Sequence, residues 1–206
     1  MRSLLKPTLL LTFLFTALVA LTRAHPADSP LRPLLTPPDG CPAPCFLGIR
    51  PGVTTLAEAT AILNTSPYVE NTRWQQSYIQ VLYWRWKAVP YDVIDSAAEG
   101  RLWIEDDIVQ EVAVSTTLAF GDVWLLLGPA ERGSFMIGRV SALRRSVAFH
   151  TALYPDAALQ VAFQAACPIR LHAFWDASVG IRWISDLNRY VNQQFYLPTW
   201  NNRSCQ

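Results

Sequence analysis

Apolar and polar residues alternate with two different periods along this chain, and together the periods predict a mixed α+β fold. Thr55 and Glu58 match a capping box, which predicts the start of a helix at this point. Apolar residues then recur at helical spacing, at Leu56, Ala59, Ile62 and Leu63. Pro67 ends this helix at or before Ser66, because a residue before proline disfavours helical backbone. The apolar stripe of the helix needs a sheet to cover.

The residues after this helix alternate with the period of β-strands. Residues 77–87 predict a strand with two bulky faces, one of which carries Tyr78, Gln80, Leu82, Trp84 and Trp86. Residues 101–105 and 108–116 predict a hairpin that turns at Glu105-Asp106-Asp107. The first half of the chain therefore reads as one helix followed by three strands.

A second helix-plus-strands pattern begins at Phe120. Residues 120–127 predict a short apolar helix that Gly128 and Pro129 end. Three strands are predicted after it, at residues 134–140, 145–154 and 157–166, with a turn at Pro155-Asp156 between the last two. The pattern predicts an α+β fold of two α-β-β-β halves, about 41–117 and 118–206.

The C-terminal tail carries weaker patterns. Residues 170–175 and 180–184 have the composition of strands, and residues 185–193 are compatible with a short helix capped by Ser185. We therefore expect a short irregular or helical tail after the second half.

The first part of the chain predicts export. Arg2 and Lys6 precede an uncharged, mostly apolar run from Thr8 to Thr22, and small residues lead to Ala24. This order is typical of a secretory signal peptide, here residues 1–24. The alternative is an uncleaved single-span anchor with the domain outside, although a membrane span needs roughly 20 apolar residues. Either way, the domain is expected to be secreted or extracytoplasmic, and an association with the cell envelope is compatible with this prediction.

A proline-rich linker is predicted between the leader and the domain. Residues 25–40 contain Pro26, Pro30, Pro33, Pro37 and Pro38. Proline at this density favours extended polyproline II, which acts as a semi-rigid spacer. The domain itself is expected to cover residues 41–206.

The four cysteines, Cys41, Cys45, Cys167 and Cys205, are an even set in a chain predicted to be exported, so two disulfides are expected. A local bridge between Cys41 and Cys45 is disfavoured if the two intervening prolines hold the segment extended, since a disulfide needs Cα atoms ~4.4–6.8 Å apart. The spacing therefore favours pairings that connect the start of the domain with Cys167 and Cys205. A turn, particularly with a cis proline, would allow the local bridge instead.

Charge and motif content exclude several function classes. Only 16% of residues are charged, the net charge is +1, and there is no Lys/Arg cluster, so a nucleic-acid partner is not expected. No phosphate loop, nucleophile elbow, zinc-protease motif or dinucleotide fingerprint is present in the sequence. No cofactor or metal is predicted, and no catalytic residue is assigned.

Two stretches suggest relatives. Cys41-Pro-Ala-Pro-Cys45-Phe-Leu-Gly-Ile-Arg-Pro-Gly52-Val-Thr-Thr55, together with Phe120-Gly-Asp-Val-Trp-Leu-Leu-Leu-Gly-Pro129, resembles a group of uncharacterised exported bacterial proteins. That group carries a Pro-Cys-aromatic-x-Gly-Ile-x-Pro-Gly-x-Thr motif and brings no known activity. More distantly, the helix-plus-strands pattern is similar to the BamE/SmpA outer-membrane-assembly lipoproteins and to tandem-repeat β-lactamase inhibitor proteins. Those families imply a binding role without catalytic machinery, and they assign no residue here.

Three local features could carry chemistry. His150 and His172, with Ser146 or Ser178, could form a hydrolase site only if the fold brings them together. The acidic turn at residues 105–107 could bind a cation, although a solvated turn explains it better. Tyr78, Trp84 and Trp86 could form an exposed binding face for sugar or peptide, or they could be core.

These patterns favour an exported, non-catalytic binding or interaction domain. Its partner would be a protein or a carbohydrate, and membrane contact would come only from an uncleaved N-terminal segment. The alternatives are a small secreted hydrolase whose site forms only in three dimensions, and an inhibitor of a secreted enzyme that presents a concave sheet.

Overall fold

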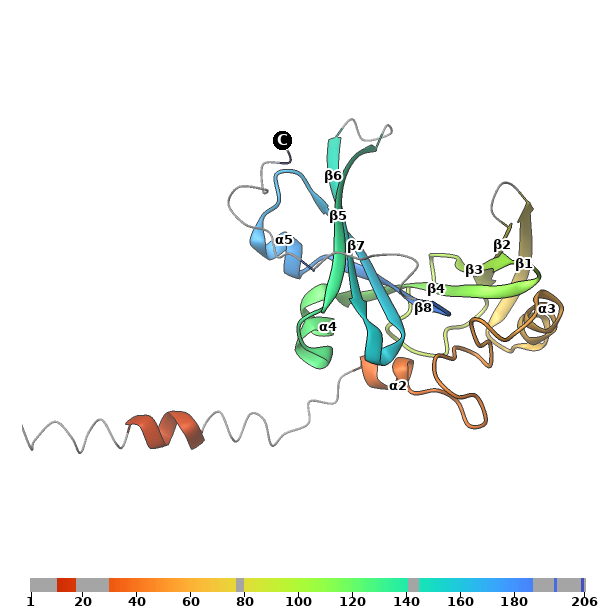
Figure 1. The fold of residues 1–206 in the computed structure, drawn as a ribbon, viewed down its shortest axis with the longest axis horizontal. Coiled ribbons are helices and arrows are strands. Elements are labelled where there is room, and N and C mark those ends of the chain that lie inside the picture. The colour runs from red at the N-terminus through yellow and green to blue at the C-terminus, as the bar shows by residue number, and fades with distance from the viewer. Residues whose placement is uncertain are drawn as a thin grey trace, which may run out of the picture.

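The computed structural model of the protein describes residues 11–17, 30–76, 80–140 and 145–186, together with residues 195 and 205. Residues 11–17 are helical, and the remaining elements form one body that is mostly sheet (Figure 1). The elements in chain order are α2 (Leu31–Leu35), α3 (Leu56–Thr65), β1 (Val69–Gln76), β2 (Gln80–Trp86), β3 (Gly100–Glu105), β4 (Ile108–Ala119), α4 (Phe120–Leu127), β5 (Arg132–Val140), β6 (Arg145–Tyr154), η1 (Pro155–Ala157), β7 (Leu159–Ala166), α5 (Leu171–Trp175) and β8 (Ser178–Ile184).

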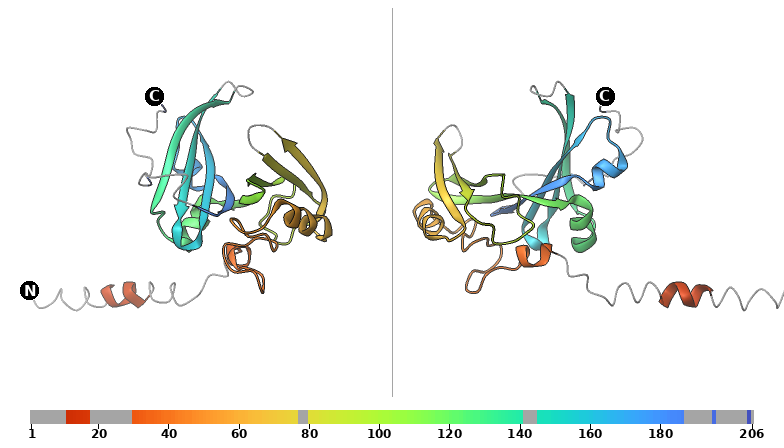
Figure 2. Two further views of the ribbon diagram at one scale, coloured as in Figure 1. Left: turned by 45° about the vertical axis from the view of Figure 1, so that its right-hand side comes forward. Right: turned by 180° about the vertical axis from the view of Figure 1, so that it is seen from behind.

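All eight strands belong to one antiparallel sheet with the order β1-β2-β3-β4-β8-β7-β6-β5. The predicted mixed α+β class is therefore confirmed. We call β1–β3 the first wing and β5–β7 the second wing; β4 and β8 lie between them. The sheet is bent so that the two wings face each other (Figure 2). Register shifts in β4, including one between Ser115 and Ala119, fit this bend because bulges bend a strand and increase its twist.

The two longer predicted helices form where their caps place them. In α3 the carboxylate of Glu58 accepts a hydrogen bond from the Thr55 backbone N–H at 2.9 Å, and Thr55 Oγ1 accepts one from the Glu58 N–H at 3.2 Å. In α4 the carboxylate of Asp122 accepts a hydrogen bond from the Ala119 N–H at 3.1 Å. Gly128 then ends α4 with a φ of 81°, which suits glycine.

Alternation within the strands produces two different sheet faces. On β4, Val112, Val114 and Leu118 are buried in the main core, and Val179 and Ile181 of β8 join them. Helices α2–α5 lie on this side of the sheet, away from the space between the wings (Figures 1 and 2). The opposite face of the same strands lines the space between the wings.

The core also includes residues before Cys41. Residues 31–35 form helix α2, and its Leu31 and Leu34 are buried in the main core cluster. This differs from the extended polyproline conformation that the proline content predicts for residues 25–40. The two leucines supply apolar area that offsets the effect of the flanking prolines.

One predicted strand is wrong, and one observed strand was missed. Residues 170–175, expected as a strand, include the short helix α5, in which Phe174 is fully buried. Five residues are too few for hydrophobic periodicity to distinguish a helix from a strand. Edge strand β1 was not predicted, because its sequence is largely polar and lacks regular alternation. The helix expected at residues 185–193 falls mostly outside the described residues.

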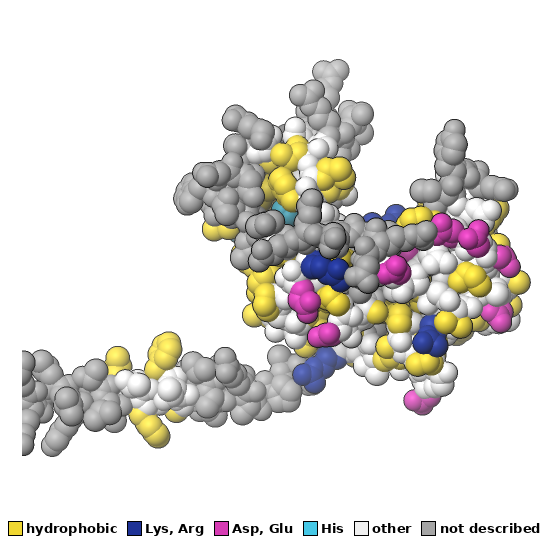
Figure 3. Space-filling view, in the orientation of Figure 1, with side chains coloured by type: hydrophobic (Ala, Val, Ile, Leu, Met, Phe, Trp, Pro, Cys, Tyr) yellow, Lys and Arg dark blue, Asp and Glu magenta, His cyan; other side chains and the backbone are white. Residues whose placement is uncertain are grey.

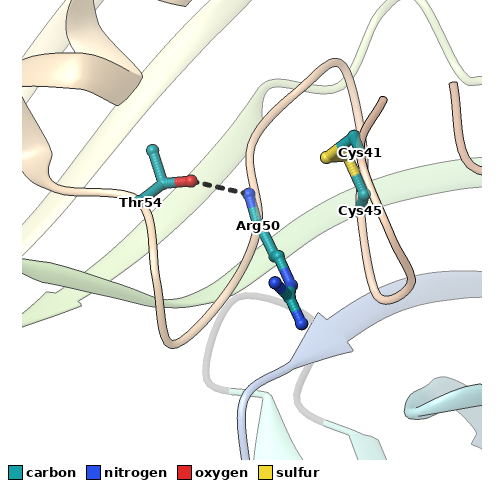
Figure 4. Close-up of a disulfide and its surroundings, with 4 residues drawn as sticks. All are labelled: Cys41, Cys45, Arg50 and Thr54. Carbon is teal, nitrogen blue, oxygen red and sulfur yellow. Dashed lines mark hydrogen bonds between the residues drawn. A yellow bond between two sulfur atoms is a disulfide. The ribbon is translucent and has the colours of Figure 1, made fainter. Parts of the chain in front are cut away.

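The disulfides pair differently from the arrangement that the proline spacing favours. Cys41 bonds to Cys45 and Cys167 bonds to Cys205. The chain turns at Ala43–Pro44, where the peptide bond is cis, and the Cα atoms of Cys41 and Cys45 lie 6.0 Å apart. The segment between them is therefore not extended. Figure 4 shows this bridge beside the loop in which the Arg50 N–H donates to Thr54 Oγ1 at 2.8 Å.

Candidate binding site on the concave face

An open groove lies between the two wings, on the sheet face opposite the described helices α2–α5. Its volume is ≈ 700 Å³, and it is lined by residues from β3 to β8 and by the loop before β3. Figure 3 shows the hollow from the direction of Figure 1, with Lys or Arg side chains in view at its base. The groove is a consequence of the bend, since a flat sheet would present no enclosed surface here.

The groove floor is made of small side chains from the three central strands. Ala113 and Ser115 come from β4, Gly180 from β8 and Ala162 from β7. Because these residues are short, a bound group can approach the backbone of the sheet closely. Aromatic and thioether groups are added by the second wing, where Phe149 of β6 pairs with Met136 of β5 and Met136 is 64% exposed.

Charged residues border the floor on the side of the first wing. Arg101 of β3 and Arg182 of β8 both contact Oε1 of Glu111, at 3.5 Å and 3.6 Å. The side chain of Glu111 is only 4% exposed, whereas that of Arg101 is 41% exposed. Glu111 is therefore a buried anion that holds two cations at the edge of the groove.

A second carboxylate stands at the rim. Glu99 accepts hydrogen bonds from Arg73 at 3.0 Å and from Arg85 at 3.4 Å. The hydrogen bond from Arg73 is the main cause that lowers the pKa of this carboxyl below its ordinary value. Glu99 therefore stays ionised and remains paired with Arg73 of β1 and Arg85 of β2.

The residues considered for a hydrolase do not form a catalytic arrangement. His150 is 2% exposed, and its ring stacks on Phe163 with centroids 4.9 Å apart, on the core side of β6. In the described part of the chain neither of its ring nitrogens has a hydrogen-bond partner. Burial lowers the pKa of His150 to about 4, so the ring is neutral at physiological pH. His172 lies exposed on α5, so the structure does not combine the two histidines into one site.

The two candidate serines are also separate from the histidine ring. Ser178 begins β8 and lines the groove, whereas the aromatic contacts of the His150 ring place it on the opposite face. Ser146 lies near the start of β6, opposite Arg139 of the edge strand. The neighbouring main chain of His150 borders the groove, but strand alternation directs its ring into the core.

The predicted aromatic face is not an exposed surface where it can be described. Trp84 is 1% exposed and Trp86 is 9% exposed, and both belong to the main core. Tyr78, the third aromatic residue of that face, lies outside the described residues. The side chains of β2 that point toward the concave side include Tyr83, whose ring lies 4.6 Å from the guanidinium carbon of Arg73.

The acidic turn forms the tip of the β3–β4 hairpin. Asp106 and Asp107 both have positive φ, at 50° and 64°, as a tight hairpin turn requires. No group of three or more His, Cys, Asp or Glu side chains suited to holding a metal ion occurs in the ranges that the structure describes. The backbone conformation of the turn therefore explains why aspartates stand at positions 106 and 107.

Apart from His150 and Ser178, which were considered for another role, the groove residues were not identified from the sequence. Arg101, Ala113 and Arg182 lie on three strands, and the period of each strand shows only which face each residue takes. Their proximity depends on β8 pairing with β4, far away in the chain. The sequence did contain one signal for the groove. Polar or small residues occupy alternate positions in strands whose other residues are apolar and predicted to be buried.

No family model matches the chain, and comparisons with curated proteins and with solved structures give no significant match. The resemblance to exported bacterial proteins thus stays a prediction. Among the described residues, no helix combines the length and the apolar character that crossing a bilayer requires.

Proposed function

We propose that this protein is an exported, non-catalytic binding protein that holds a partner in its concave groove. The observation that carries the proposal is the groove itself, ≈ 700 Å³ in volume, on the sheet face opposite helices α2–α5. Its lining combines small, apolar and charged groups, the mixture that gives a binding site both contact area and orientation. A strand face that served only as a solvated exterior would not need a buried Glu111 between two arginines.

Export is supported by the cysteine chemistry and by the leader. Both disulfides have ordinary Cα separations, 6.0 Å and 5.9 Å, and such bonds persist in oxidising compartments. In the predicted signal peptide, Leu11, Phe13 and Phe15 are each more than 70% exposed. Apolar side chains that are exposed in the described residues 11–17 suit a segment with a targeting role.

We also infer that the two halves are copies of one helix-plus-sheet unit. Helix α3 is followed by β1–β4, and α4 is followed by β5–β8, with α5 inserted before β8. The sheet order places β1 and β5 at the two edges and β4 and β8 side by side at the centre. This arrangement supports a duplicated unit of one helix and four strands, one strand more in each half than the sequence pattern predicts.

The inhibitor hypothesis is one form of this binding role, since an enzyme loop could enter the same groove. The hydrolase alternative has less support. It needs a histidine that can accept a proton beside a nucleophile, whereas His150 is packed among aromatic rings on the other sheet face.

The proposal is tested by comparing partners retained by the immobilised wild-type protein and by two arginine variants. Ser115→Arg places a bulky cation on the groove floor, and Leu125→Arg makes the same change at a position on α4 that is 86% exposed. Quantitative mass spectrometry should find a partner whose recovery falls with Ser115→Arg and not with Leu125→Arg. Partners that are retained equally by both folded variants would contradict the groove as the binding site.

A further inference from the structure

One row of directly paired residues crosses the entire sheet on its concave face. From edge to edge the row contains Arg73, Tyr83, Arg101, Ala113, Arg182, Gln160, Leu153 and Arg132. Arginine occupies β1, β3, β8 and β5 in this row. The central pair, Arg101 and Arg182, stands on the two strands that flank β4, with Ala113 between them.

Arg101 and Arg182 stand on either side of β4 at Ala113. Neighbouring strands lie about 4.8 Å apart, so the Cα atoms of Arg101 and Arg182 are separated by roughly 10 Å across β4. Both guanidinium groups turn toward β4, where each contacts the same oxygen of Glu111. Ala113 itself is only 6% exposed, whereas the side chain of Arg101 is 41% exposed and lines the groove. Arg101 therefore presents an accessible cationic group to the groove.

Arg101 retains hydrogen-bonding capacity on the groove side. A guanidinium has five N–H donors. Among the described residues, Arg101 makes one such contact, from Nη2 to Oε1 of Glu111 at 3.5 Å. The charge of Glu111 is also shared with Arg182. Of the acidic residues that line the groove, Glu99 is engaged by Arg73 and Arg85, and Asp95 accepts a hydrogen bond from the Ala97 N–H. Arg101 is therefore incompletely neutralised on its groove side.

We propose that the concave groove binds an acidic side chain of a protein partner, an Asp or Glu carboxylate that pairs with Arg101 on its groove side. This inference rests on the proposed binding function and names the partner's chemistry. Glu111 acts as a positioning residue that holds the guanidinium of Arg101 at the edge of the seat. When the partner covers the groove and excludes water, the ion pair becomes stronger, because the local dielectric falls.

A protein side chain fits the groove better than a sugar acid. Sugars are commonly stacked on exposed aromatic platforms, and Trp84 and Trp86 are buried in the core. The groove instead combines two partly exposed arginines, Arg101 and Arg182, with Phe149 and the exposed Met136. An adaptable thioether and an aromatic ring beside a charged group suit a polypeptide loop with mixed side chains.

The inference is tested by selecting random linear peptides that bind the secreted protein with both disulfides formed. The selected peptides are then measured against wild type, Arg101→Gln, Ser115→Arg and the matched control Arg170→Gln. Arg170 is an exposed arginine that lies outside the groove lining and precedes α5. We expect an Asp or Glu at one conserved peptide position, and affinity that falls at least about tenfold with Arg101→Gln and is unchanged with Arg170→Gln.

A double-mutant cycle gives the sharper result. Replacing the conserved acidic residue of the peptide by its amide should weaken binding to wild type about as much as Arg101→Gln does, and should add little when Arg101 is already replaced. Peptides that lose affinity with Ser115→Arg but show no acidic position overturn the acidic-partner inference and leave the groove as a binding site. If no peptide is sensitive to Ser115→Arg, both the inference and the proposed function fail.

A third arm addresses sugar acids directly. Polygalacturonate serves as the probe, and its binding is compared between wild type and Arg101→Gln. If it binds wild type and loses affinity with Arg101→Gln as the peptides do, the assignment to a protein partner is overturned. Absence of such binding, together with the peptide results above, supports it.

Discussion

The indole ring of Trp84 occupies the space above Gly100, its direct partner across β2 and β3. A Cβ atom placed on Gly100 would lie 2.1 Å from two carbons of this ring. Trp84 is itself only 1% exposed and has its other contacts within the core. Glycine at this position is therefore a requirement of close approach between a strand and a buried aromatic side chain.

Gly100→Ala should consequently destabilise the protein by about 2–3 kcal/mol, because the buried indole cannot move without disturbing its neighbours. The free energy of unfolding from chemical denaturation measures the effect. Gly180→Ala is the matched control, since a Cβ there meets its nearest atoms at 3.6 Å, an ordinary contact distance. Equal stability changes for the two variants would show that Trp84 does not occupy the described position.

The leucines of α2 should be part of the cooperative fold even though they precede the first cysteine. Leu31 is completely buried, so Leu31→Ala should cost about 2–5 kcal/mol in the free energy of unfolding. Leu125→Ala makes the same substitution at a site that is 86% exposed and should change stability by no more than about 0.5 kcal/mol. A negligible effect of Leu31→Ala would mean that the segment before Cys41 does not dock.

The two disulfides should contribute unequally. The Cys167–Cys205 bond joins residues separated by 38 positions, and the Cys41–Cys45 bond joins residues separated by 4. In the chain-entropy model, removal of the first by paired Cys→Ser substitution should cost about 4 kcal/mol and removal of the second about 2 kcal/mol. Denaturation of the two double variants gives the ranking.

Non-reducing peptide mapping of the wild-type protein checks the pairing on which that ranking rests. It should recover one peptide pair that joins Cys167 with Cys205 and one short peptide that contains the bond between Cys41 and Cys45. Cross-linked peptides that join either of the first two cysteines to either of the last two would contradict the described pairing.

His150 should make the protein less stable in mild acid. Its pKa is lowered from 6.5 to about 4 in the folded state, so between these pH values the unfolded chain binds a proton that the folded chain does not. Stability should therefore fall as the pH drops from about 6.5 to about 4, by up to about 3 kcal/mol in total. Unfolding free energies measured across this range test the expectation.

The contribution of His150 can be isolated with His150→Phe. A phenyl ring keeps the aromatic contacts with Phe163 and Phe174 and removes two buried nitrogens that have no hydrogen-bond partner in the described part of the chain. This variant should be at least as stable as wild type at neutral pH. Between about pH 6.5 and pH 4, its free energy of unfolding should change much less than that of wild type. An unchanged pH dependence would mean that other groups cause it.

Local elements were predictable from the sequence where a local signal exists. The Thr55–Glu58 capping box, the stop at Gly128 and the hairpin turn at residues 105–107 each determine a short stretch of backbone through contacts within a few residues. Alternation also assigned Trp84 and Leu82 to one strand face, which the structure places in the core. These features depend little on the rest of the chain.

Long-range relationships were not predictable in the same way. The pairing of β8 with β4 and β7 joins segments far apart in sequence, and nothing local to Gly180 or Arg182 encodes those partners. The turn at Ala43–Pro44 likewise reverses the expectation for Cys41 and Cys45. The groove depends on both the bend and the cross-strand register, so its residues become neighbours only in the folded sheet.

If the concave face is the surface that binds a partner, site-specific photocrosslinking in the producing cell should capture that partner there. A photoreactive residue is placed at Ser115 on the groove floor or at Leu125 on exposed α4. We predict a discrete crosslinked adduct from position 115 and none from position 125. A folded, exported protein that gives no adduct from position 115, or that crosslinks only from position 125, would contradict the account.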